Sequence, residues 1–139
     1  MIVRSAPPEH YDWIASRANL VISSQFRAIE AMNGEDKILG MVGFDGWTPN
    51  AVSVHIALER PELLRRMVRV ALGTAFTVRN VVIAPVLSNN ARSIKMVEGV
   101  GFTRSGELKD AWEPGVDLLL YQMRRDQCRW IREALRWVA

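Results

Sequence analysis

The 139-residue sequence has little cysteine and little histidine, which limits the chemistry that it can support. Cys128 is the only cysteine, so the chain can form neither an internal disulfide nor a cysteine-based metal cluster. His10 and His55 are the only histidines, and their wide separation in the sequence argues against a zinc site. The sequence therefore predicts no metal cofactor.

Long apolar segments are also lacking. No run approaches the roughly 20 residues that a membrane-spanning helix needs, and residues 1–8 lack the apolar stretch of a signal peptide. We therefore expect a cytoplasmic protein with no membrane contact. The length suits one domain over residues 1–139 that is large enough to bury a core.

The charge is mildly positive, with a net value of +3 and an isoelectric point near 9.5. Such a protein is suited to anionic ligands such as nucleotides, although arginines on solvated helix faces explain the same charge. The arginines are scattered, without a basic tail or alternating basic and aromatic residues, which argues against nucleic-acid binding.

The periodicity of apolar residues predicts both helices and strands. Residues 51–58 alternate as a strand with one buried face, whereas an apolar stripe after Pro61 has helical spacing. The predicted elements are a helix at 9–20, strands at 26–32, 37–44 and 51–58, a helix from residue 61, a strand at 78–87, a helix at 91–100, strands at 103–111 and 116–123, and a helix at 125–138.

This order predicts a mixed fold, described as α/β or α+β. Short turns join the first three strands, as in an antiparallel meander, and a helix separates the third strand from the fourth, as in a parallel crossover. Pro85 in the fourth strand cannot donate a ladder hydrogen bond and marks an edge, a bulge or a place where strands part. The last helix is expected to pack on the sheet or against a second copy in a homodimer.

A family resemblance rests on this order and on the segment Asn90-Ala91-Arg92-Ser93-Ile94-Lys95-Met96-Val97-Glu98-Gly99-Val100-Gly101-Phe102. The segment resembles the capped helix of GNAT acetyltransferases, which opens with asparagine and ends in Gly-Phe before a strand. Residues 105–111 are similar to the branch of ribosomal-protein N-terminal acetyltransferases and to GNAT-like proteins of phages and prophages. The resemblance covers roughly residues 22–123.

The resemblance implies a mostly antiparallel, twisted sheet with splayed central strands, flanking helices and a cleft for acetyl-CoA as co-substrate. An amine, on a small molecule or a protein N-terminus, would be the acceptor. By position, the family's coenzyme contacts fall on Ile56, Ala57, Leu58, Leu64, Arg65, Arg66, Met67, Val68, Asn90 and Ser93.

Two positions depart from the family pattern. The usual glycine-rich loop is replaced by residues 63–68, which contain no glycine to let the backbone approach phosphate closely. Arg65 and Arg66 either compensate with charged contacts or form a solvated helix face. Val97 stands where many members carry a tyrosine that protonates the departing thiolate. The alternative to an active enzyme is therefore a degenerate GNAT fold that binds coenzyme A or serves a structural role, in a phage context.

Amide formation from a thioester needs a base for the amine proton and stabilisation of the leaving thiolate. His55 is the first candidate base, because imidazole accepts protons at neutral pH and the residue precedes the expected splay. Glu59 is the second, although it also suits a helix start. Ser93 and Tyr121 are candidate acids, with helix capping and half-buried packing as their structural alternatives.

Overall fold

The computed structural model describes residues 1–131 and forms one seven-stranded sheet in the order β1-β2-β3-β4-β5-β7-β6. Every pairing is antiparallel except that of β4 with β5, which confirms the predicted mixed, mostly antiparallel sheet. The strands are β1 (Ile2–Ser5), β2 (Arg27–Met32), β3 (Ile38–Asp45), β4 (Ala51–Leu58), β5 (Val81–Leu87), β6 (Thr103–Glu113) and β7 (Val116–Arg124).

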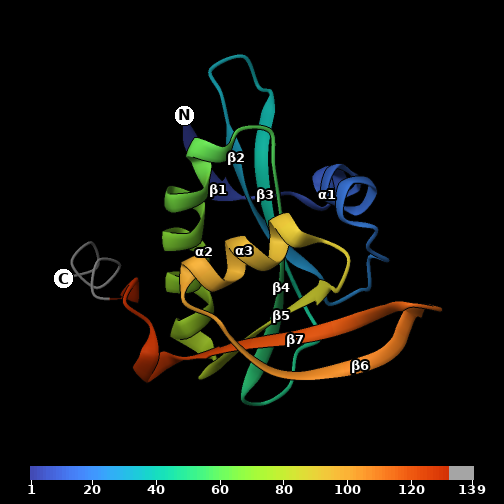
Figure 1. Cartoon of the computed structure of the whole chain (residues 1–139). Coiled ribbons are helices and arrows are strands. Elements are labelled where there is room, and N and C mark those ends of the chain that lie inside the picture. The colour runs from blue at the N-terminus through green and yellow to red at the C-terminus, as the bar shows by residue number, and fades with distance from the viewer. Residues whose placement is uncertain (132–139) are drawn as a thin grey trace.

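In the described part of the chain, three α-helices cover the sheet, and they divide between its two faces (Figure 1). Strand alternation assigns the faces: Ile29 and Ala31 join the core under α2 and α3, whereas Ala28 joins a smaller cluster under α1. Within the described residues, none of these helices is both long and apolar enough to cross a bilayer. The helices are α1 (Tyr11–Ala18), α2 (Leu64–Val78) and α3 (Ala91–Val100), with 3-10 turns η1 (Pro8–His10), η2 (Pro61–Leu63) and η3 (Arg125–Gln127).

The predicted boundaries hold best where a turn or cap punctuates the chain. Residues 51–58 and 91–100 match β4 and α3, and Gly101 ends α3 in a left-handed conformation with φ 118°. The first strand, β1, was not predicted, because four residues before a Pro-Pro pair carry little periodicity. The predicted strand at 78–87 begins too early, since α2 continues through Val78 and β5 starts at Val81.

The predicted C-terminal helix at 125–138 is wrong at its start. Arg125–Gln127 form a 3-10 turn, and Cys128 is extended, with φ −85° and ψ 110°. The indole of Trp130 then donates to the carbonyl of Val100 at 2.9 Å, so this segment returns to the end of α3. Residues 132–139 lie outside the described part of the chain.

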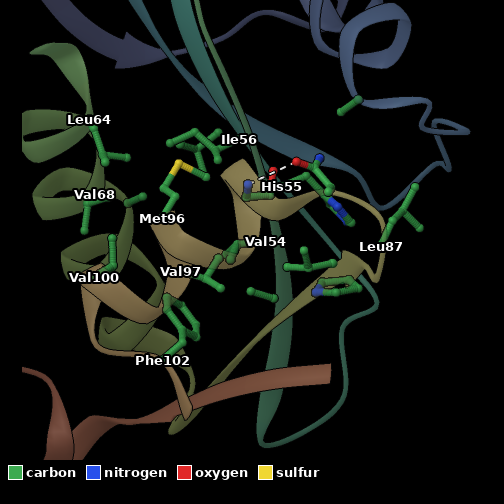
Figure 2. A pocket seen from close by; sticks show the side chains of 18 of the residues that line it. Val54, His55, Ile56, Leu64, Val68, Leu87, Met96, Val97, Val100 and Phe102 are labelled. Atoms are coloured by element: carbon green, nitrogen blue, oxygen red, sulfur yellow. Dashed lines mark hydrogen bonds between the residues drawn. The ribbon is translucent and has the colours of Figure 1, made fainter. Parts of the chain in front are cut away.

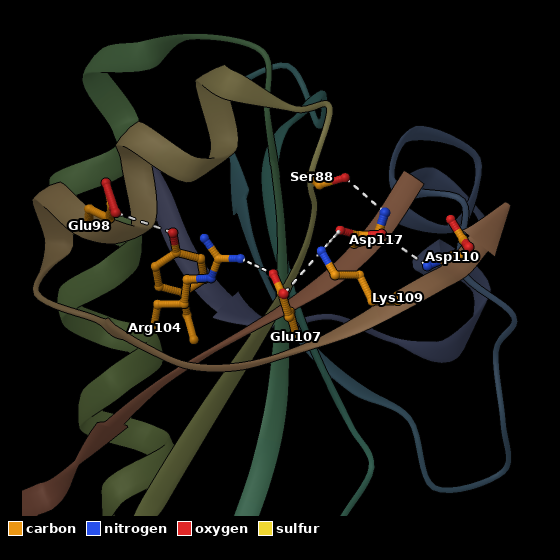
Figure 3. Close-up of polar contacts among 8 residues, drawn as sticks. Ser88, Glu98, Arg104, Glu107, Lys109, Asp110 and Asp117 are labelled. Carbon is orange, nitrogen blue, oxygen red and sulfur yellow. Dashed lines mark hydrogen bonds and ion pairs between the residues drawn. The ribbon is translucent and has the colours of Figure 1, made fainter. Parts of the chain in front are cut away.

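The β6–β7 hairpin extends beyond the helices and is held by polar contacts along its length (Figures 1 and 3). Lys109 bridges Glu107 and Asp117 at 3.2 and 3.4 Å. The backbone N–H of Asp110 donates to Asp117, which lowers the pKa of that carboxyl. Ser88 at the end of β5 accepts from the N–H of Asp117 at 2.8 Å, so the hairpin is tied to the centre of the sheet.

Candidate functional site

The central strands β4 and β5 pair over only part of their length. The parallel register joins residues 51–53 to 81–83 and ends at Ser53 and Ile83, while β3 remains paired with β4 as far as Leu58. Pro85 offers no N–H to either neighbour. The edge of β4 that faces β5 therefore has no partner strand from Val54 to Leu58, and the predicted separation of these strands is confirmed.

A cavity of about 280 Å³ occupies this gap (Figure 2). Its walls come from both faces of the sheet, because α1 contributes its C-terminal end and α2 and α3 contribute apolar side chains. The cavity therefore passes through the sheet and has one side toward α1 and one toward α2 and α3. The labelled lining residues are Val54, His55, Ile56, Leu64, Val68, Leu87, Met96, Val97, Val100 and Phe102.

A second concave surface continues from this cavity between the start of α2 and α3. We call it the outer groove; Leu64 and Met96 lie in both the cavity wall and the groove wall. The groove is rich in cations, which Glu62 only partly balances. These cations are Arg65, Arg92, Lys95 and Arg129.

The β4–α2 connection has few backbone donors to offer an anion. Pro61 has no N–H, the N–H of Leu63 donates to Arg60 at 3.2 Å, and the N–H of Leu64 donates to Pro61. In place of a glycine-rich loop, this connection thus forms a 3-10 turn whose backbone N–H groups bond within the turn. Any attraction for phosphate in this region must come mainly from the charged side chains of the outer groove.

His55 lies in the cavity wall on the α1 face of β4. Its Nε2 lies 2.7 Å from the Oδ1 of Asp45, at the end of β3. The side chains of His55 and Asp45 are only 16% and 24% exposed, so solvent screens their hydrogen bond incompletely. The sequence analysis did not single out Asp45, because an Asp-Gly pair between strands is the usual signature of a turn.

Glu59, the other candidate base, follows β4 but does not line the cavity. It pairs at 3.1 Å with Arg17, which does line it, and its N–H donates to Leu39. The structure therefore brings His55 to the cavity, whereas Glu59 contacts a residue of the cavity wall, Arg17.

Asn90 and Ser93 meet at the start of α3, and both line the cavity. The Oδ1 of Asn90 accepts the N–H of Ser93 at 3.0 Å, which caps the helix. Ser93 also faces the outer groove. Capping and cavity lining are thus compatible duties of the same two residues.

Tyr121, the other candidate acid, is not brought to the cavity. Its hydroxyl donates to Glu98 on α3 at 3.2 Å, and the residue is 2% exposed in the core. Burial, with a smaller contribution from the hydrogen bond to Glu98, raises the pKa of this phenol.

The remaining candidate contacts divide into two groups. Ile56 and Leu58 face the cavity or the outer groove, as do Leu64, Arg65 and Val68. The other three lie elsewhere: Ala57 packs on the α1 cluster, Met67 is fully buried in the core, and Arg66 is an exposed residue that lines neither hollow.

The sequence itself matches no family model and no curated protein. Solved structures do match it. The spermidine/spermine N-acetyltransferase SpeG of Vibrio cholerae, in mutant forms, has a TM-score of 0.75 at 12% identity, over 99% of each chain. The same enzyme in complex with CoA and spermine has a TM-score of 0.72 at 14% identity, over 91% of this chain and 96% of that one. The protein smu.2055 of Streptococcus mutans UA159 gives 0.73 at 19%, over 89% and 99%.

The fold is that of the GNAT acetyltransferases. Three groove cations, Arg92, Lys95 and Arg129, were missed by the sequence analysis. Arg129 gave no signal, because its place beside α3 depends on a chain return that follows the whole sheet.

Proposed function

We propose that this protein is an acyl-CoA-dependent N-acyltransferase that transfers an acetyl group from acetyl-CoA to a primary amine. The observation that carries the proposal is the cavity that passes through the sheet where β4 and β5 separate. Two reactants that enter from opposite faces can meet there without a covalent enzyme intermediate. The GNAT fold, in which SpeG binds CoA and spermine, supports this use of the cavity.

The described residues suit an acyl-pantetheine arm in chemistry and position. The open edge of β4 from Val54 to Leu58 presents backbone groups without a partner strand, which suits the amides of pantetheine. Apolar side chains of α2 and α3 cover the opposite wall. The phosphates would lie in the outer groove, where Arg65, Lys95 and Arg129 supply charge that the β4–α2 backbone does not.

The acceptor would approach from the α1 face, where His55 lines the cavity. The amine nitrogen attacks the thioester carbonyl, the C–N bond forms and the C–S bond breaks. His55 takes the proton that the amine loses, directly or through water. It is preferred over Glu59 because it reaches the cavity, whereas Glu59 pairs with Arg17.

The departing sulfur needs a hydrogen-bond donor, since Val97 cannot supply one from α3. Ser93 lies at the start of the same helix, and among the α3 residues that line the cavity it is the one with a hydroxyl. Coenzyme A leaves as a thiolate that Ser93 stabilises, and the thiolate then takes a proton from solvent. The acceptor is an amine of a small molecule or of a protein N-terminus, as in the branch that residues 105–111 resemble.

Isothermal titration with acetyl-CoA tests the binding step, and release of free thiol with a panel of amines tests transfer. We expect micromolar binding and amine-dependent thiol release. Binding without release from any amine would favour a coenzyme-binding module instead. Absence of binding at millimolar acetyl-CoA would overturn the proposal and leave a structural role.

Two matched variants test whether the coenzyme uses this cavity. Ser93→Trp places an indole in the cavity wall, and we expect it to weaken acetyl-CoA binding by at least tenfold. Ala91→Trp introduces the same side chain at an exposed residue of the same helix that lines neither the cavity nor the outer groove. Equal binding by both variants would mean that acetyl-CoA binds elsewhere.

A further inference from the structure

We infer that Asp45 is a positioning residue for the reaction, because its carboxylate binds one ring nitrogen of His55 and so orients the imidazole. This inference rests on the proposed acyl transfer. Its starting point is the 2.7 Å contact between Asp45 Oδ1 and His55 Nε2. An ionised carboxylate can only accept, so Nε2 carries the proton of this hydrogen bond and Nδ1 is the nitrogen left to act as base.

The register of β3 and β4 explains why these two side chains meet. His55 lies opposite Gly43, and Asp45 lies opposite Ser53, two residues along each strand. Residues two apart share a face of the sheet, so Asp45 is the diagonal neighbour of His55 on the α1 face. Gly43, opposite His55, carries no side chain, and the ring of Phe26 occupies the space that a Cβ there would take.

The turn that follows Asp45 is held at several points, which fixes the carboxylate. Gly46 has φ 58°, a left-handed conformation that glycine adopts without strain. The indole of Trp47 donates to the carbonyl of Gln25 at 2.9 Å, and the hydroxyl of Thr48 accepts the N–H of Ala51 at 2.9 Å. A carboxylate on a constrained turn can orient a partner with little loss of side-chain entropy.

The other histidine provides a contrast within the same molecule. His10 lies 2.7 Å from Glu30 through Nδ1, and Glu30 is fully buried and also bound by Arg4 at 2.9 Å. That pair lies in neither the cavity nor the outer groove. The two carboxylates therefore engage opposite ring nitrogens, and only one of the two imidazoles lines the cavity.

The first test is proton and nitrogen NMR of histidine-labelled protein at mildly alkaline pH, which needs no turnover. With two histidines the spectrum is simple to assign. We expect a downfield, slowly exchanging Nε2 proton for His55, and we expect it to vanish in Asp45→Ala while the His10 resonances stay. Absence of this proton in the unaltered protein overturns the inference.

The second test is a double-mutant cycle with acetyl-CoA and the best amine of the panel. Asp45→Ala should lower kcat about tenfold or more with KM for acetyl-CoA within twofold, and Asp45→Asn should lie between. In a His55→Ala background, Asp45→Ala should have no further effect, because a positioning residue acts only through its partner. Additive losses, or an unchanged kcat, overturn the inference while turnover persists. Absence of turnover in the unaltered protein defeats the proposed function itself.

Discussion

The two halves of the β4–β5 pair differ sharply although they belong to the same two strands. In the paired half, Val52 and Val82 are opposite each other, fully buried and packed in the main core. In the open half, Val54 and Ala84 would be the next pair on this face if the register continued, but they line a cavity instead. The contrast teaches that a strand can be packed in the core at one end and line a cavity at the other, without any change in its apolar pattern.

The largest difference between the halves should appear in turnover. His55→Ala is expected to lower kcat by about 100-fold or more, because the amine proton loses its acceptor. Ser53→Ala is the matched control, on the same strand and face but inside the paired half. Steady-state rates of thiol release per folded molecule measure both. A kcat of His55→Ala equal to that of Ser53→Ala would remove His55 from the reaction.

Stability should show the opposite asymmetry. Val52→Ala removes two buried methyl groups from the closed core and should cost about 2 kcal/mol of unfolding free energy. Val54→Ala, the same change two residues along, borders a cavity and should cost less than half as much while weakening acetyl-CoA binding. Urea unfolding and calorimetric titration provide the two readouts. If both variants lost equal stability, the open half would be packed like the core.

The sequence predicted the open half better than it predicted what surrounds it. Pro85 is a local signal that left an edge, a bulge or a parting of strands open, and the family resemblance implied the separation that the structure has. The partner of His55 depends on the β3–β4 register, which is a property of the folded sheet. Asp45 therefore had no signature beyond that of a turn.

The outer groove shows the same limit. Arg65 was predicted from its place in the loop, but Lys95 and Arg129 face the groove only because α3 and the segment after η3 come together beside α2. Arg66, which follows Arg65 in the sequence, lines neither the cavity nor the outer groove. Helix phase and chain return, rather than composition, decide which cations can meet a phosphate.

The position of Arg65 in the outer groove predicts a modest electrostatic effect on acetyl-CoA binding. Arg65→Gln should weaken acetyl-CoA binding by about three- to tenfold, because an exposed charge contributes limited energy to a phosphate contact. Arg66→Gln is the matched control. Titration at low and high salt should show the difference shrinking as ionic strength rises. Equal losses would indicate that net charge, not the groove, attracts the coenzyme.

The smallest expected effect concerns Tyr121 on β7. It pairs with Ala84, the first residue of β5 beyond the half that is paired with β4. Burial and the hydrogen bond to Glu98 raise the pKa of Tyr121 above that of an unfolded tyrosine, near 10. As pH rises past 10, the unfolded chain therefore loses this proton first, and the unfolding free energy falls. Tyr121→Phe removes the linkage, so its stability should decline less steeply in that range, after a loss of about 1 kcal/mol at neutral pH.

Urea unfolding at neutral and alkaline pH measures how steeply the unfolding free energy falls with pH. The kcat of Tyr121→Phe tests whether Tyr121 takes part in the reaction. Because its hydroxyl is bound to Glu98 and does not line the cavity, Tyr121→Phe should keep kcat within about twofold. A 100-fold loss would mean that the hydroxyl leaves Glu98 and protonates the thiolate. Tyr121 would then act with the residues of the open half. The residues that serve the reaction would in that case extend across β5 to β7, instead of ending at β5.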